Sequence, residues 1–353
     1  MPRILLGWQA TEGEVDLVGQ ELPEGCDVVT VPPHETVSPA DCDIGLLADC
    51  ARDADCLMTW IIGPRVYKLA NRLKLIAWLH SGIDPIDLET LRARQIRLTN
   101  VAGANATAVA EHAAALMLAL AKRVVERDAR VKRGEWVPLW NEPTAAALLD
   151  GGTLLVVGMG QIGKRIARYA RAFGMRVIGV RRSGRPEDGF DATYGPADLT
   201  EAIAQADFVI LAVPHTAETD KLISRDEFAA MKKGAFLINV GRGRIVDEIA
   251  LRKALDSRHV AGFASDVWWS YPRNLPEGWH YAVPSRLGVH LMPQVIASHD
   301  SASDATPVKR SMIRLGAINV KAFLAGERPP NLVFDGTKLV GSLAGLDRQP
   351  VDF

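Results

Sequence analysis

Three glycines, Gly158, Gly160 and Gly163, are the first residues whose type and spacing could do chemistry, because they directly follow the apolar run LLVV. The spacing Gly-x-Gly-x-x-Gly, with the helical pattern KRIARYARAFG behind it, is typical of a turn that binds a dinucleotide. The first glycine permits a tight turn, the second lets backbone approach a pyrophosphate, and the third lets helix pack on strand. Gln161 and Ile162 would begin the helix, whose free N–H groups face the phosphates. The pattern therefore predicts a dinucleotide site, against the alternative of an ordinary glycine-rich turn.

The residues after the next strand-like run, MRVIGV, bear on which dinucleotide is bound. An NAD site places an acid there for the ribose 2′-hydroxyl, whereas this chain has Arg181, Arg182 and Ser183. Two guanidinium groups and a hydroxyl match the oxygens of a 2′-phosphate, and the guanidinium charge is permanent. We therefore expect NADP, with NAD as a second cofactor. The alternative is a solvated pair of loop arginines.

Composition bounds the class of protein. The chain has 353 residues, 48% hydrophobic and 24% charged, as expected for a globular protein of about two domains. The net charge of −1 argues against nucleic acid as the main partner, because binding to a phosphate backbone needs a concentrated basic face. No apolar run approaches the roughly 18 residues of a membrane span, and the N-terminal MPRILLGW lacks a signal pattern. We expect no membrane partner and a cytoplasmic location.

The four cysteines, Cys26, Cys42, Cys50 and Cys56, form no Cys-x-x-Cys pair and have no histidine at zinc-finger spacing. Zinc ligands require closer pairing than this. We expect free thiols and no bound metal.

Apolar runs alternate with helical patterns along most of the chain: DVVTV, CLMTWII, LKLIAWL, RLTNV, TLLVVG, RVIGV, FVILAV, AFLINV and AGFASDV. That alternation predicts an α/β protein with parallel sheets. The longest helical pattern runs from 106 to 136 and is rich in Ala and Leu on more than one face. Such a pattern indicates burial against a partner helix, either in the other subunit of a homodimer or within the same chain.

Five ordered segments carry a family resemblance: LKLIAWLHSGIDPID, NATAVAEHAAALMLAL, VPHTAETDKLI, MKKGAFLINVGRGRIVDEIALRKAL and AGFASDV. Through them the chain resembles, from about Leu73 to Asn331, the D-isomer-specific 2-hydroxyacid dehydrogenases, which include glyoxylate/hydroxypyruvate reductases and phosphoglycerate, phosphite and formate dehydrogenases. The resemblance implies two Rossmann-like doubly wound domains with a substrate cleft between them. A flavodoxin-like substrate domain (1–100 plus 297–353) would surround an inserted dinucleotide-binding domain (101–296).

The resemblance also implies that the Asn-x-x-Arg-Gly segment presents a catalytic arginine, Arg242. Its forked guanidinium could hold the carboxylate and carbonyl oxygens of a keto acid, which a lysine could not match. The alternative is a surface arginine in a turn. Further cofactor contacts implied by the resemblance are Val213, Pro214, Thr219, Val240, Gly241 and Asp266.

His299, in QVIASHDSAS, is the candidate acid/base, because imidazole exchanges protons near neutral pH. The segment is similar to the family's strand followed by Pro-His-x-x-Gly, with Ser298 in place of the proline. The resemblance implies a glutamate partner for the histidine five residues after Asp266, where this chain has Tyr271. The imidazolium then lacks a counter-charge. Tyr271 could orient the ring or contact substrate, or it could belong to an aromatic core.

Substrate anions are expected, again from the resemblance, at backbone N–H groups of Ser81 and Gly82. Trp60, in CLMTWIIGP, lies where relatives with charged substrates carry a cation. An indole there favours an apolar or aromatic substrate tail, and the alternative is a core residue. His112, in the long helical pattern, is expected to pack without a chemical role.

These features favour an NADP-dependent oxidoreductase that transfers a hydride between nicotinamide and a 2-keto or D-2-hydroxy acid. A formate or phosphite dehydrogenase is a second hypothesis, weakened because no formate-site asparagine loop is recognisable and HSGID holds no lysine. A third hypothesis is a dinucleotide-sensing corepressor, against which Arg242 and His299 favour an enzyme.

Overall fold

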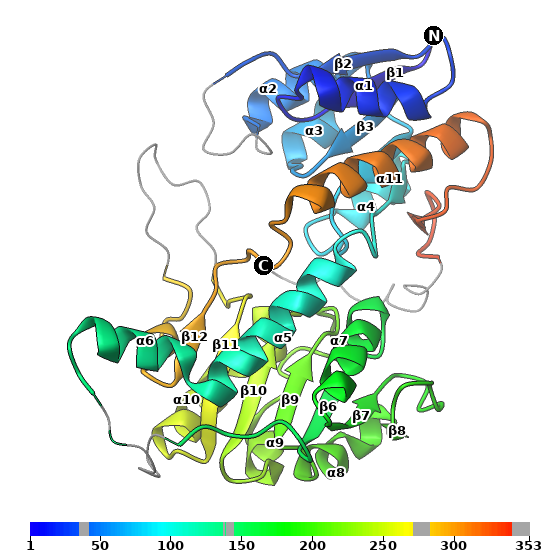
Figure 1. Cartoon of the computed structure of the whole chain (residues 1–353). Helices are drawn as coiled ribbons and strands as arrows, with labels where there is room; N and C mark the ends of the chain where they lie inside the picture. Colours follow the sequence, from blue (N-terminus) through cyan, green and yellow to red (C-terminus); the bar gives the residue numbers. More distant parts are fainter. Residues whose placement is uncertain (35–41, 137, 139–144, 271–282, 341–353) are drawn as a thin grey trace. The chain divides into compact units, whose positions relative to one another are not determined.

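The computed structural model describes the chain apart from residues 35–41, 137, 139–144, 271–282 and 341–353 (Figure 1). The described residues form two compact units. Unit 1 comprises Met1–Asn105 and the chain from Ala305 onward, and unit 2 comprises Ala106–Asp304. The second boundary therefore lies after residue 304 rather than after 296, which places His299 in unit 2. The reason is a set of hydrogen bonds from residues 298–302 to Asp266, described below.

Unit 1 is built on a six-stranded sheet in the order β13-β5-β4-β3-β1-β2. Strands β1 to β5 are mutually parallel in the order 2-1-3-4-5 of a flavodoxin-like sheet, and β13 pairs antiparallel with β5 at the edge. The strands are β1 (Arg3–Leu6), β2 (Asp27–Thr30), β3 (Cys56–Thr59), β4 (Leu75–Trp78), β5 (Arg97–Thr99) and β13 (Leu332–Phe334).

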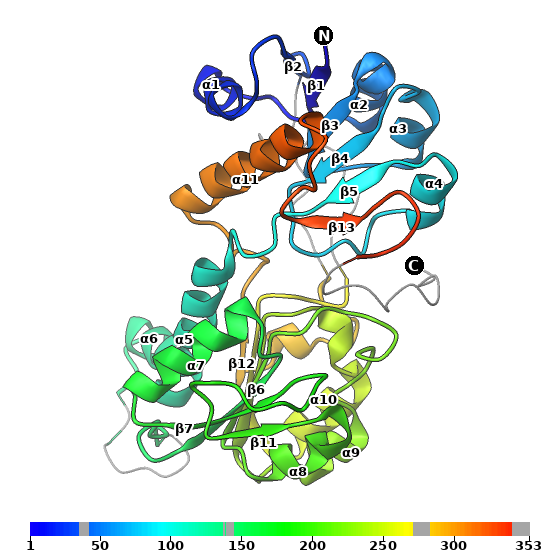
Figure 2. The same ribbon diagram turned by 90° about the vertical axis from the view of Figure 1, so that its right-hand side faces the viewer.

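Helices cover both faces of the unit 1 sheet, which is why its strands β3 and β4 are buried at every position (Figure 2). One face carries α1 (Glu12–Glu21) and α11 (Thr306–Leu324), which lie side by side although one comes from each end of the chain. The other face packs against α2 (Ile44–Cys50), α3 (Pro64–Leu69) and α4 (Leu88–Ala93).

Unit 2 is built on a seven-stranded sheet in the order β12-β11-β10-β9-β6-β7-β8, with every pair of neighbours parallel. Numbered within the unit, this is the Rossmann order 3-2-1-4-5-6 extended by a seventh strand. The strands are β6 (Thr153–Val157), β7 (Arg176–Val180), β8 (Ala192–Tyr194), β9 (Phe208–Leu211), β10 (Ala235–Asn239), β11 (Val260–Ser265) and β12 (Val295–Ala297). The expected pair of doubly wound α/β sheets is confirmed.

Two hydrophobic clusters, one on each face, hold the unit 2 sheet. Alternate residues of β6 show the division, because Leu154 and Val156 belong to one cluster and Leu155 and Val157 to the other. The first face packs against α5 (Ala106–Lys122) and α7 (Gln161–Ala172). The second packs against α8 (Leu199–Ala204), α9 (Arg225–Ala230) and α10 (Glu248–Asp256).

The helical pattern from 106 to 136 forms two helices rather than one. Arg123, with φ of +54°, interrupts it between α5 and α6 (Val124–Lys132). A left-handed residue cannot continue a right-handed helix, so the chain changes direction there. Among the described residues, no helix is both long and apolar enough to cross a bilayer, and no three His, Cys, Asp or Glu side chains gather as a metal site.

Candidate functional site

The glycine turn lies at the point in the unit 2 sheet where the strand order reverses. β6 pairs with β7 on one side and with β9 on the other, so the turn after β6 opens between diverging connections. Gly158 has φ of +103°, and a Cβ there would lie 2.5 Å from the carbonyl oxygen of Ala212. A Cβ on Gly163 would lie 2.0 Å from the carbonyl oxygen of Gly158, so α7 can approach β6 only with glycine.

Gly160 differs from its two neighbours in the motif, because a Cβ there would meet nothing within 4 Å. It is the N-cap of α7 and provides no side-chain cap, so the first N–H groups of the helix, at Gln161 and Ile162, have no capping side chain. A backbone surface with open space, free donors and the positive end of a helix dipole fits a pyrophosphate. The residues present therefore fit a dinucleotide.

The loop after β7 presents the predicted cations. Arg181 donates from Nη1 to Glu187 at 2.6 Å, and Glu187 also accepts from Lys164 of α7 at 2.7 Å. Arg182 and Ser183 are exposed. The Thr216 hydroxyl, followed by lesser contributions that include the Arg182 charge, lowers the pKa of Glu218 in the loop after β9. The Arg182 charge therefore bears on the loop after β9 as well as on its own loop.

Strand register brings Arg242, Asp266 and His299 to one edge of the sheet. Asn239 at the end of β10 is paired with Ser265 at the end of β11, which is paired with Ala297 at the end of β12. The three residues follow these strand ends by three, one and two positions, and the carboxyl ends of parallel strands share one edge. The pKa of Asp300, the residue after His299, responds to the charges of the same three residues. Burial and the negative charge of Asp266 raise its pKa, while Arg242 and His299 act in the opposite direction.

The turn that carries Arg242 is braced by Asn239, whose side chain is 1% exposed. The Asn239 amide donates to the carbonyl of Arg242 at 2.9 Å and its oxygen accepts from Gly241 N–H at 3.0 Å. Arg242 has extended backbone, and Nη1 donates to the Gly241 carbonyl at 2.8 Å. The first residue of the Asn-x-x-Arg-Gly pattern therefore fixes the backbone from which the arginine extends.

The predicted cofactor contacts on the neighbouring turns lie together. A Cβ on Gly241 would come within 2.7 Å of the carbonyl of Val213, so the turns after β9 and β10 touch. Val240 is buried in the cluster on the face that packs against α5 and α7. Thr219 closes the loop after β9, since its hydroxyl donates to the Pro214 carbonyl at 2.7 Å and accepts from Thr216 N–H at 2.8 Å.

A histidine that sequence reasoning did not single out braces the same loop. His215 Nε2 lies 2.7 Å from Asp220, which also accepts from Arg244 Nε at 3.0 Å. Burial opposes ionisation of Asp220, but the hydrogen bond with His215 and the Arg244 charge lower its pKa. This network links the loop after β9 to the turn after β10.

The predicted substrate loop belongs to unit 1. Trp78 donates to the Gly82 carbonyl at 2.8 Å, and Asn100 donates to the Ser81 carbonyl at 2.7 Å, so this loop is fixed from two sides. Within the described residues, the backbone N–H groups of Ser81 and Gly82 donate to no protein acceptor. They are available to bind an anion.

Trp60 is largely buried in unit 1. Its exposed fraction is 8%, its ring meets Trp8 edge-on at 4.6 Å between centroids, and Lys309 lies 5.8 Å from its centre. Trp8 and Lys309 both contact Glu14, at 3.1 and 2.7 Å. This packing favours the core interpretation of Trp60 over contact with a substrate tail.

The structure describes the surroundings of His112 but not those of Tyr271. Tyr271 lies outside the described residues, so its role stays a prediction. His112, expected only to pack, places Nε2 3.4 Å from Asp266 Oδ1. Within the described residues that buried nitrogen has no hydrogen-bond partner. The approach to Asp266 could not be read from the helical pattern, because the aspartate lies 154 positions away in the sequence.

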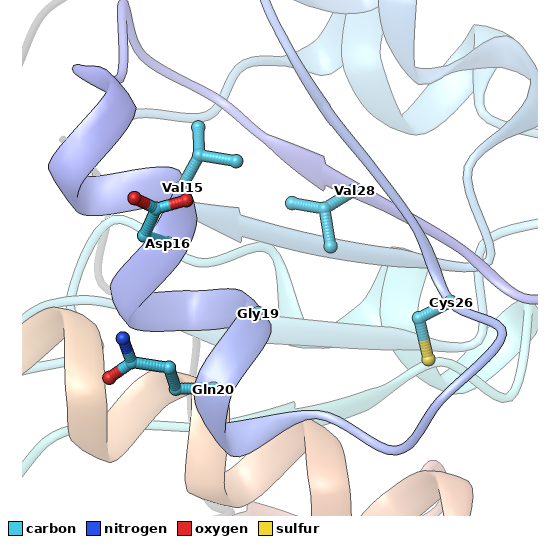
Figure 3. A pocket seen from close by; sticks show the side chains of 6 residues that line it. All are labelled: Val15, Asp16, Gly19, Gln20, Cys26 and Val28. Atoms are coloured by element: carbon cyan, nitrogen blue, oxygen red, sulfur yellow. The ribbon is translucent and has the colours of Figure 1, made fainter.

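A separate hollow of about 410 Å³ lies in unit 1 between α1 and the start of β2 (Figure 3). It is lined by Val15, Asp16, Gly19, Gln20, Cys26 and Val28. This lining has no cation to hold an anionic substrate and none of the predicted site residues, so it is not the candidate site.

Comparison with known proteins agrees with this geometry. The sequence profile described as "D-isomer specific 2-hydroxyacid dehydrogenase, NAD binding domain" matches residues 114–291. A glyoxylate reductase from Aeropyrum pernix is 37% identical over 309 residues, covering 86% of each chain. One from Thermococcus gammatolerans is 33% identical over 342 residues, covering 94% of this chain and 96% of the relative. The NADPH-dependent glyoxylate/hydroxypyruvate reductase of Sinorhizobium meliloti in complex with citrate superposes with a TM-score of 0.74, at 27% identity, covering 96% of this chain and all of that one.

Proposed function

The chain belongs to the D-isomer-specific 2-hydroxyacid dehydrogenases, and from that premise we propose that it reduces 2-keto acids to D-2-hydroxy acids with NADPH as its preferred cofactor. The coarser statement follows from the family: the protein is an NAD(P)-dependent oxidoreductase of 2-keto and 2-hydroxy acids. The direction, the cofactor preference and the residue roles below are the proposal.

One observation carries the proposal. A permanent cation, a buried carboxylate and an imidazole, Arg242, Asp266 and His299, follow three adjacent parallel strands at the same edge of the sheet as the glycine turn. Reduction of a ketone needs a cationic donor at the carbonyl and a proton for the nascent alkoxide. Both kinds of group are present at that edge.

Each residue then has a defined task. Arg242 holds the substrate carbonyl and carboxylate through its forked donors, and His299 gives its proton to the oxygen as the carbonyl is reduced. The N–H groups of Ser81 and Gly82 bind the substrate carboxylate. When bound, the nicotinamide supplies the hydride. Asp266 has one lone pair on Oδ2 left for a cofactor amide, because a carboxylate accepts about four hydrogen bonds and the loop supplies three.

The decisive experiment is reduction of a panel of keto acids by the purified protein. NADPH and NADH oxidation would be followed with glyoxylate, hydroxypyruvate, pyruvate and phenylpyruvate, and chiral chromatography would identify the product of those that give a chiral acid. His299→Gln should abolish turnover. His259→Gln is the matched control, because His259 lies before β11, at the opposite strand ends, and within the described residues its ring bonds only the Met231 carbonyl. Failure of the wild type on every acid, or L products, would refute the proposal.

We also propose that the enzyme is a homodimer joined through the region of α6. Large apolar side chains stand exposed there, with Val124, Val125 and Val131 each more than half exposed and Trp136 86% exposed. Monomers rarely leave such a group uncovered, so a second copy is the occupant that fits. Val125→Glu combined with Val131→Glu should shift the mass measured by light scattering from dimer to monomer. A wild-type monomer at micromolar concentration would contradict the proposal.

A cytoplasmic location is supported by the state of the cysteines, all four of which are free thiols. Disulfides are uncommon in reducing compartments, where free thiols persist. Fractionation of cells that express the untagged chain would test this location.

A further inference from the structure

Asp266 is enclosed by the loop that carries His299. The Ser298 hydroxyl donates to Asp266 Oδ1 at 2.6 Å, Ser301 N–H donates to the same oxygen at 3.0 Å, and Ala302 N–H donates to Oδ2 at 3.0 Å. A fourth bond, from Asp300 N–H to the backbone carbonyl of Asp266, is 2.8 Å long. Asp266 is only 3% exposed, so these bonds form away from competing water. We call this arrangement the Asp266 clasp.

The loop backbone is shaped to make the clasp. Asp300 has φ of +61°, in the left-handed region that aspartate enters more readily than most residues but still at a cost. A left-handed residue lets successive N–H groups point into one concavity, the arrangement that proteins use to bind anions. Here the anion is the protein's own Asp266 carboxylate, and the hydrogen bonds offset the cost of the backbone conformation.

Ser298 is fixed on every polar atom. Its N–H donates to the Ser265 carbonyl at 2.9 Å, and its carbonyl accepts from Trp268 Nε1 at 2.7 Å. Its hydroxyl also lies 3.1 Å from that of Ser301. His299 therefore follows one immobilised residue and precedes another, Asp300, which leaves its backbone little freedom.

From this geometry we propose that Asp266 and Ser298 are positioning residues, which hold the loop that carries His299 in the place required for proton transfer. The inference rests on the proposed function and deepens it. The Ser298 hydroxyl is the informative part, because it stands where the family pattern has proline, which could make neither the hydroxyl bond nor the N–H bond.

Three variants test the proposal. Ser298→Ala removes only the hydroxyl donor, Ser298→Thr retains it, and Ser257→Ala is the matched control. The Ser257 hydroxyl bonds the Ala254 carbonyl at the end of α10, away from the clasp. Ser298→Ala should lower kcat for keto-acid reduction by about tenfold or more, because small misplacements of a reacting group are costly. Its NADPH dissociation constant, from quenching of tryptophan fluorescence, should change less than twofold. Threonine should restore most of kcat, and Ser257→Ala should behave as wild type.

The pH profile separates positioning from a general loss of stability. The charged groups next to His299 are Asp300 and, acting on Asp300, Asp266 and Arg242, with His112 of α5 against Asp266. A displaced His299 meets these charges at altered distances. The alkaline limb of kcat/KM for reduction, where the protonated donor is lost as pH rises, should therefore move in Ser298→Ala and return in Ser298→Thr. A loss of kcat with an unmoved profile would overturn the proposal. A fall in NADPH affinity as large as the fall in kcat would also overturn it, because the clasp would then serve cofactor binding rather than the positioning of His299.

A measurement that needs no turnover distinguishes failure of this inference from failure of the proposed function. With 13Cε1-labelled histidine, the His299 signal can be assigned by its loss in His299→Gln and titrated in the full chain without cofactor. Ser298→Ala should move both its chemical shift and its midpoint, and Ser298→Thr should not. If the wild type reduces no keto acid yet the signal moves, the proposed function fails and the clasp stands. An unmoved signal would show that the Asp266 clasp does not position His299.

Discussion

Arg182→Ala should reduce the use of NADPH and leave the use of NADH unchanged, because only NADPH carries the 2′-phosphate. The two arginines of the loop after β7 are not equivalent. Arg181 is already bonded to Glu187 at 2.6 Å, whereas the Arg182 side chain is exposed and its charge reaches across to Glu218. Arg182 can therefore turn to a phosphate without giving up a short ion pair.

The size of the effect follows from the chemistry of the contact. A hydrogen bond to a charged group contributes about 1.5–3 kcal/mol, which corresponds to roughly 10- to 150-fold in affinity at 1.4 kcal/mol per factor of ten. Arg181→Ala should cost less than Arg182→Ala, because the Arg181 guanidinium must exchange Glu187 for the phosphate. Arg181→Asp should do more than either, since it adds a negative charge beside Glu187 and moves the preference toward NADH.

The assay is kcat/KM for each cofactor at saturating keto acid, at low and moderate ionic strength. Arg225→Ala is the control for loss of one surface charge, because the side chain of Arg225, the first residue of α9, is 92% exposed. An equal loss with NADPH and NADH would show that Arg182 merely shapes the loop. No loss with either, or a wild type that uses NADH as well as NADPH, would refute the assignment of the 2′-phosphate to this loop.

Other expectations concern catalysis, thiols and acid stability. Arg242→Ala should nearly abolish kcat/KM while the melting temperature is retained, and Arg242→Lys should recover little of it; near-normal turnover would remove this residue from the site. Half-exposed Cys26 and Cys50 should react with a disulfide reagent in the native protein, whereas Cys56, which is fully buried with its pKa raised to about 12 by that burial, should react only on unfolding; fast native reaction of all thiols would contradict this. The Val177 N–H and, less strongly, the Arg171 guanidinium lower the pKa of Asp191, so its stabilising effect is present above about pH 4 and lost as pH falls below it. Asp191→Asn should therefore lower the melting temperature by about 2–4 °C at pH 7, with the difference from wild type vanishing in acid; a constant difference would show that the charge is irrelevant.

The strand-turn-helix at Gly158 was predictable because its signals are local. The apolar strand, the three glycines and the amphipathic helix lie within about twenty positions, and a Cβ on Gly158 or Gly163 would clash with neighbouring backbone. The nine apolar runs likewise became strands, and most of these strands are buried on both faces. The strands β8 and β13 were not anticipated, because three residues carry too little pattern to distinguish strand from loop.

The break in the helix at Arg123 and the end of unit 2 could not be predicted from the neighbouring sequence. Neither glycine nor proline marks the junction of α5 and α6, so the helical pattern continues through a residue that is left-handed in the structure. The boundary after 304 depends on Asp266, which holds residues 298–302 from more than thirty positions away. The Glu187 partner of Arg181 shows the same limit, because a loop sequence does not reveal which charges meet.

Asp266 also shows why an assigned role can be incomplete. The resemblance implied a cofactor contact, and a residue with that single duty would need only one oxygen turned toward the nicotinamide. In the structure both oxygens accept bonds from the loop of His299, and only part of the capacity of Oδ2 remains. A substitution at Asp266 would thus disturb the cofactor and the proton donor together, and its effect could not be divided between them. The hydroxyl of Ser298 takes part only in positioning the loop of His299 and not in the cofactor contact. The contribution of positioning can therefore be measured at Ser298 and not at the aspartate itself.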